Sequence, residues 1–147
     1  MTDRVIVMRK LTALAEHVAR LRRRRPAQVD RLRDDVDLQD ALAMSLVVCV
    51  QAALDVAVHI ASDEGFGVPA SYASAFQMLA DRGILTSATS RQLASMAALR
   101  NRIAHGYASV DFPRIWQELP DGIAAFDAFL QEVTKHLGPR DRGSESI

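Results

Sequence analysis

The sequence predicts an all-α fold, an antiparallel bundle of four to five main helices. Apolar residues recur every three or four positions through most of the 147 residues, and the alternating pattern of strands is scarce. The composition, 49% hydrophobic and 24% charged, is that of a globular domain. We therefore expect one helical domain over residues 1–138 and a polar, flexible tail over 139–147.

The amino-terminal half predicts two long helices. Apolar residues over 5–21 follow one stripe, and Pro26 stops this first helix. After a polar stretch at 28–40, residues 41–62 are apolar on nearly every side, which places that helix at the centre of a bundle or under a second subunit. The same segment is the one membrane suspect, but a mid-bilayer Asp55 is costly, which favours a buried helix of a soluble protein.

Caps and glycines divide the next part of the chain. A short helix over 71–82 is expected to end at Gly83, because glycine readily takes the left-handed conformation found at helix ends. Thr86 or Ser87 then caps a helix that runs to about 105, where Gly106 stops it.

The last segment has its own start and stop signals. Asp111 is the expected cap of a further short helix, which Pro120 interrupts. We expect Asp121 to restart the helix, and its apolar stripe ends before Gly138 and Pro139.

Several kinds of site are missing from the sequence. The single cysteine, Cys49, excludes an intramolecular disulfide and a four-thiolate zinc site. We find no glycine-rich phosphate loop, no HExxH and no nucleophile elbow, and the scattered histidines predict neither a metal site nor a cofactor. A formal charge of zero argues against general nucleic-acid affinity, and the lack of a signal-peptide pattern predicts a cytoplasmic location.

One segment, residues 100–107, has the composition of a catalytic site. Asn101 and His105 are four residues apart and share a helix face, whereas Arg100 lies about 140° from His105 around a regular helix. An arginine that holds a phosphate and a histidine that transfers protons can cleave an RNA phosphodiester without a metal. The alternative is a basic helix end with a capping histidine.

A second polar line follows the apolar helix at Gln51, Asp55 and His59, with a spacing of four residues. Polar side chains on a buried helix must find partners. They form either a structural Asp55–His59 hydrogen bond inside the core or one wall of the pocket that holds His105, and a single pair can serve both purposes.

The arginines at 20 and 22–25 are the third polar feature. They either form a solvated helix end whose charge matches the helix dipole, or contact an RNA backbone without sequence preference.

Taken in order, these residues resemble the HepT-like branch of the HEPN superfamily, small all-α ribonuclease toxins of prokaryotic toxin–antitoxin pairs. The resemblance covers about residues 42–133. It implies a homodimer in which the Arg/His motifs of both subunits meet in a cleft. The matching landmarks are Gln51-Ala52-Ala53-Leu54-Asp55, His59-Ile60, Pro69, Ser71-Tyr72, Ala75-Phe76, Leu79-Ala80, Gly83-Ile84-Leu85, Arg100-Asn101, His105, Tyr107 and Val110-Asp111.

The resemblance also implies the chemistry of the site. The activity would be a metal-independent endoribonuclease acting on tRNA or mRNA. His105 would be its acid and base, Arg100 would hold the phosphate, and Asn101 would position either group. A minimal nucleotidyltransferase antitoxin would use ATP to AMPylate Tyr107, and the added charge and bulk would block RNA. The implied partners are RNA, the antitoxin and a second copy, with a larger hetero-oligomer as a further option.

A different class of function stays open at this point. The chain could be a non-catalytic helical dimer that binds a nucleotide or protein for a nucleotidyltransferase partner. The presence of Arg100, Asn101, His105 and Tyr107 together favours the enzyme, since a scaffold has no need of all four.

Overall fold

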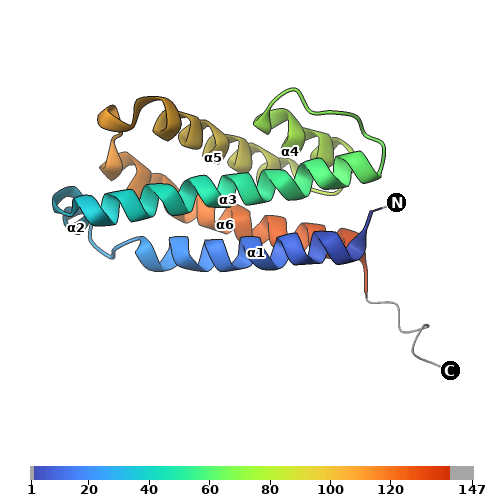
Figure 1. The fold of residues 1–147 in the computed structure, drawn as a ribbon, viewed down its shortest axis with the longest axis horizontal. Coiled ribbons are helices and arrows are strands. Elements are labelled where there is room, and N and C mark those ends of the chain that lie inside the picture. The colour runs from blue at the N-terminus through green and yellow to red at the C-terminus, as the bar shows by residue number, and fades with distance from the viewer. Residues whose placement is uncertain (1, 140–147) are drawn as a thin grey trace.

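The computed structural model describes residues 2–139, and these form a helical bundle without a strand (Figure 1). The predicted all-α fold is confirmed. The predicted tail falls, from residue 140 on, outside the described residues. The elements are α1 (Arg4–Arg24), α2 (Val29–Asp34), α3 (Val36–Asp63), α4 (Tyr72–Asp81), α5 (Ser87–Gly106), the 3₁₀ turn η1 (Tyr107–Ser109) and α6 (Phe112–Leu137).

The long helix α3 crosses the bundle between α1 on one side and α4 and α5 on the other (Figure 1). It begins five residues earlier than the sequence predicts, because Asp35 caps it by accepting a hydrogen bond from the Leu38 amide at 3.0 Å. Its outer face is not covered, since the side chains of Met44 and Val58 are 61% and 39% exposed. Within one chain, α3 therefore has a buried inner face and an open outer one, and cover of the outer face by a second subunit stays a prediction.

Among the described helices, α3 has the length and hydropathy of a membrane span. Half of that apolar stretch is buried inside the bundle. Cys49 lies at its centre, fully buried, and burial raises the pKa of this thiol to about 12.

The interruption predicted at Pro120 is wrong, because α6 runs unbroken from Phe112 to Leu137. Proline has no N–H, so it leaves the carbonyl of Trp116, four residues earlier, without its helical partner. Arg25 supplies one: its Nε donates to that carbonyl at 3.1 Å, and its guanidinium lies 4.1 Å from the centre of the Trp116 ring. The Trp116 indole in turn donates to the Pro26 carbonyl at 2.8 Å, which ties the end of α1 to α6.

This contact makes Arg25 a structural residue. We expect Arg25→Ala to lower the free energy of unfolding by about 1.5–3 kcal/mol, the range for a hydrogen bond from a charged group. Urea unfolding followed by far-UV circular dichroism measures the effect. The matched control is Arg23→Ala, an exposed arginine at the same helix end. Equal losses from the two substitutions would contradict the role given to Arg25.

Two more arginines of this run contact other helices. Arg22 forms an ion pair with Asp127 of α6, and Arg24 donates to the Ser45 hydroxyl on α3. Together with Arg25, they hold the end of α1 against its neighbours. The positive charge in the last turn of α1 also matches the helix dipole. This match is the first of the two alternatives given for these arginines, the other being contact with an RNA backbone.

Candidate functional site

The residues of the catalytic pattern lie on the last turns of α5 and on η1. Thr86 caps α5, as predicted, by accepting a hydrogen bond from the Thr89 amide at 3.1 Å. The helix then runs back along α3, so that its carboxy-terminal end lies at the same end of the bundle as the start of α3 (Figure 1). The chain turns tightly at η1, and Asp111 caps α6, again as predicted.

Arg100 and Asn101 face α4 and an apolar groove. The guanidinium of Arg100 lies 5.3 Å from the centre of the Tyr72 ring, and one of its terminal nitrogens donates to the Asn101 side-chain oxygen at 3.3 Å. Its Nε is shielded from solvent and has no hydrogen-bond partner among residues 2–139. The groove has a volume of about 520 Å³ and is lined by Leu54 and Val58 of α3, residues 69–73, and Ala94, Ala97, Ala98 and Asn101 of α5.

His105 stands alone at the end of α5. Its side chain is exposed, in the last turn of the helix. Within a single chain the structure does not bring Arg100 to His105: the arginine packs on Tyr72, and the histidine borders a different cavity. Arg100 and His105 therefore stay on different sides of α5, as their predicted separation of about 140° implies, and the arginine side chain does not reach the histidine.

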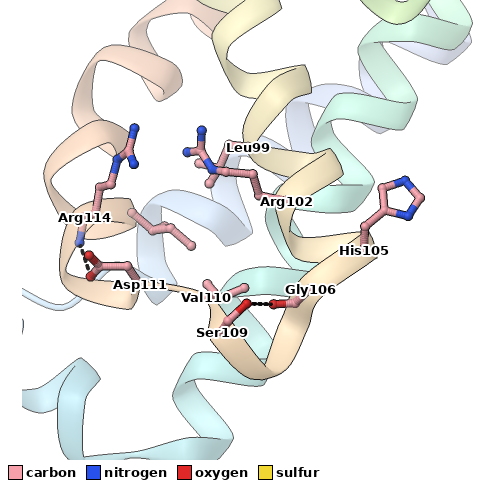
Figure 2. Close-up of a pocket in the computed structure, with 9 residues that line it drawn as sticks. Leu99, Arg102, His105, Gly106, Ser109, Val110, Asp111 and Arg114 are labelled. Carbon is pink, nitrogen blue, oxygen red and sulfur yellow. Dashed lines mark hydrogen bonds between the residues drawn. The ribbon is translucent and has the colours of Figure 1, made fainter.

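That second cavity lies between α5, η1 and α6 and has a volume of about 380 Å³. Arg102 and Arg114 line it, and both contact Glu118, at 3.2 and 3.0 Å. Figure 2 shows the His105 ring directed away from these two arginines, at the rim of the cavity. Sequence reasoning missed Arg102 and Arg114, since nothing in their spacing shows that one glutamate joins them.

Tyr107, in η1, is held against the start of α3. Its hydroxyl donates a hydrogen bond to Asp40, and its ring packs edge-on against Phe112 with the ring centres 6.1 Å apart. The hydrogen bond to Asp40 raises the pKa of Tyr107 to about 12, with further contributions from burial and from the charge of Asp40. Asp40 was not singled out by the sequence, where it is the last residue of a polar stretch.

The raised pKa of Tyr107 can be measured. In a Tyr72→Phe background one tyrosine remains, and we expect its phenolate absorbance to appear near pH 12. Asp40→Asn should return the midpoint to about 10, the ordinary value. Because the pKa is raised in the fold, the stability it contributes is complete below about pH 10 and is lost as the pH rises further. Circular dichroism on the same samples shows that the bundle is folded at each pH. Equal midpoints with and without the Asp40→Asn substitution, both in folded protein, would refute the contact.

The second polar line does not form the predicted pair. Asp55 is exposed and binds Lys10 of α1 at 2.6 Å, and His59 lies 3.2 Å from Asp63, so the hydrogen bond between Asp55 and His59 inside the core is wrong. Gln51 is exposed on the same helix. Gln51 and Asp55 therefore face outward, whereas His59 is half-buried.

Known proteins resemble this chain in sequence and in fold. The family model described as "Ribonuclease HepT-like" matches residues 14–133. The mRNA nuclease HepT of Shewanella oneidensis is 27% identical over 103 residues, which cover 70% of this chain and 77% of that protein. The tRNA nuclease HepT of Aphanizomenon flos-aquae is 23% identical over 133 residues, 90% of each chain.

Solved structures share the fold. The tri-AMPylated HEPN toxin of Shewanella oneidensis, in complex with its MNT antitoxin, superposes with a TM-score of 0.81 at 24% identity and covers 92% of this chain and 99% of its own. YutE of Bacillus subtilis, described as a cytosolic protein of unknown function, gives a TM-score of 0.77 at 19% identity, over 95% and 96% of the two chains. At these identities the likeness shows the fold alone. Since the family model spans most of the chain, from within α1 to within α6, the protein belongs to the ribonuclease HepT-like family.

Proposed function

We propose that this chain is the toxin of a toxin–antitoxin pair, a cytoplasmic endoribonuclease that cleaves tRNA or mRNA without a metal ion. The observation that carries the proposal is the placement of Arg100, Asn101 and His105 within the last two turns of α5, where Asn101 and His105 are exposed and Asn101 lines the apolar groove. Two relatives named as nucleases, one of mRNA and one of tRNA, support the substrate class.

A second copy of the chain completes the site. One subunit holds Arg100 on Tyr72 and presents His105 elsewhere, so a single chain does not assemble the pair. Val58, exposed on α3, lines the apolar groove next to Asn101, and Met44 is exposed further toward the start of the same helix. Burying this face against its counterpart removes apolar surface from water and brings the two copies of α5 together. The cleft between the two subunits then contains Arg100 and His105 of both.

In this cleft each side chain has a task. A neutral His105 takes the proton of a ribose 2′-hydroxyl, whose oxygen attacks the adjacent phosphorus. A protonated imidazole gives a proton to the departing 5′-oxygen, which leaves a 2′,3′-cyclic phosphate. Arg100 places its guanidinium on the phosphate, where negative charge grows in the transition state, and Asn101 orients it.

The antitoxin acts on Tyr107. We infer that a minimal nucleotidyltransferase transfers AMP from ATP to this hydroxyl, which is part of a side chain 43% exposed and two residues from His105. A phosphodiester at that position adds negative charge and the bulk of a nucleotide to the entrance of the cleft, which repels RNA. A HEPN toxin of the same fold has been solved in its tri-AMPylated form in complex with an MNT antitoxin, which supports this regulation.

The test is cleavage of end-labelled tRNA and mRNA by the purified, unmodified protein in EDTA. The proposal expects cleavage with 2′,3′-cyclic phosphate ends and a dimer in analytical ultracentrifugation. If the protein, shown by intact mass to be unmodified, binds the nucleotidyltransferase but cuts neither RNA, the ribonuclease is refuted. The chain is then the non-catalytic binding module.

A further inference from the structure

The contact between Tyr107 and Asp40 joins two distant parts of the chain at an exposed position. Asp40 lies near the start of α3, and its carboxylate accepts the phenolic hydrogen bond from η1. The Tyr107 ring is fixed from another side by the edge-on contact with Phe112. The phenol is therefore held by a hydrogen bond at its hydroxyl and by one ring contact, while Tyr107 stays 43% exposed.

The turn that carries Tyr107 is itself closed. The Ser109 hydroxyl donates to the Gly106 carbonyl at 3.0 Å, and the Val110 amide donates to the Tyr107 carbonyl at 3.2 Å. These bonds fix the backbone on both sides of Tyr107. An acceptor that is already oriented loses less entropy when a nucleotide arrives, and so reacts faster.

Nucleotidyl transfer to a phenol needs a place for the proton. The ordinary pKa of tyrosine is about 10, so the hydroxyl is protonated at neutral pH and its oxygen is a weak nucleophile. In the free protein the hydrogen bond to Asp40 keeps the phenol neutral and its proton on the line between the two oxygens. As the oxygen–phosphorus bond forms, the phenol becomes strongly acidic and the carboxylate is positioned to receive the proton.

We propose that Asp40 is the general base of the AMPylation of Tyr107, an inference that rests on the proposed modification. The phenolic oxygen attacks the α-phosphorus of ATP, and the new O–P bond forms as the bond from that phosphorus to the β-phosphate oxygen breaks. Pyrophosphate leaves, and the phenolic proton passes to the Asp40 carboxylate. The toxin thus supplies the base, and the partner supplies ATP.

Other groups near Tyr107 are less suited to this role. Asp111 accepts a hydrogen bond from the Arg114 amide at 3.1 Å as the cap of α6. In the part of the chain that the structure describes, His105 on α5 forms no hydrogen bond with the Tyr107 hydroxyl. Asp37 is exposed one turn earlier on α3 and does not contact the phenol. Among residues 2–139, Asp40 is the carboxylate that accepts the Tyr107 hydroxyl.

The test compares Asp40→Asn with the matched control Asp37→Asn in single-turnover reactions with the cognate nucleotidyltransferase and Mg-ATP. Asparagine keeps the size and a hydrogen-bond acceptor but cannot take a proton. Intact mass measures AMP on Tyr107. We expect Asp40→Asn to slow transfer about 100-fold near neutral pH, within the usual range for a general base. The rate of AMP transfer to the Asp40→Asn variant should also increase tenfold per pH unit. Without the carboxylate, only the ionised phenol reacts, and its fraction increases tenfold per pH unit below its pKa. Asp37→Asn should behave as wild type.

The outcomes separate this inference from the function on which it rests. Modification of Asp40→Asn at the wild-type rate overturns the inference, and so does slower modification with an unchanged pH profile, which indicates a structural contact. RNA cleavage by unmodified Asp40→Asn, measured beside wild type, shows that the fold and the nuclease site persist. If wild type takes up no AMP from an active antitoxin, the proposed modification fails, and the base with it.

Discussion

His105→Ala is expected to lower the rate of RNA cleavage about 10²- to 10⁴-fold, the usual contribution of a positioned acid or base. The imidazole is the side chain whose ordinary pKa lets it both accept and donate a proton near neutral pH. Because His105 is exposed, its removal leaves no cavity in the bundle. The variant should therefore fold and dimerise as wild type does.

Single-turnover cleavage of labelled RNA measures this effect, with circular dichroism and sedimentation on the same samples. His17→Ala, on α1, is the matched control and should retain full activity. Added imidazole should restore part of the cleavage by His105→Ala, because it replaces the missing base. Wild-type rates in a folded His105→Ala dimer would remove His105 from the mechanism.

Tyr107→Phe is expected to abolish silencing by the antitoxin and to leave RNA cleavage in place. Phenylalanine keeps the edge-on packing against Phe112 and loses the hydrogen bond to Asp40. The turn is therefore less stable, but its ring contact is retained. The variant has no oxygen to receive AMP. Co-expressed with the antitoxin, it should arrest growth where wild type does not.

The measurement pairs intact mass after incubation with antitoxin and ATP with a growth assay. Tyr72→Phe is the control, since it retains the ring on which Arg100 stacks and should be silenced normally. If Tyr107→Phe still gains the mass of AMP, the modification lies on another residue. If it gains none and is still silenced, binding by the antitoxin is sufficient, and AMPylation is not the silencing step.

Local signals predicted the helices well. Thr86 and Asp111 cap the helices they were expected to cap, because a cap is formed by residues three positions apart. The interruption predicted at Pro120 was wrong because Arg25, at the end of α1, donates the hydrogen bond that the Trp116 carbonyl loses to the proline. No local pattern contains that contact.

In the candidate site, too, local spacing was predicted correctly and contacts between helices were not. The spacing correctly put Asn101 and His105 on one helix, while their catalytic roles stay predictions. The partners of Asp55 and of Tyr107 depend on which helices become neighbours, and they proved to be Lys10 and Asp40. A helix period tells which residues share a face but not which neighbour that face meets.

The single cysteine at the centre of α3 gives this bundle a built-in reporter of its own opening. A thiol that is fully buried, with its pKa raised to about 12, reacts with an alkylating reagent only when the surrounding helices separate. Its labelling rate therefore follows how often the native bundle opens, without an engineered probe. RNA, a second subunit or the antitoxin, if it binds the closed bundle preferentially, slows labelling in proportion to that preference. One chemical measurement then ranks the strength of all three associations on a common scale.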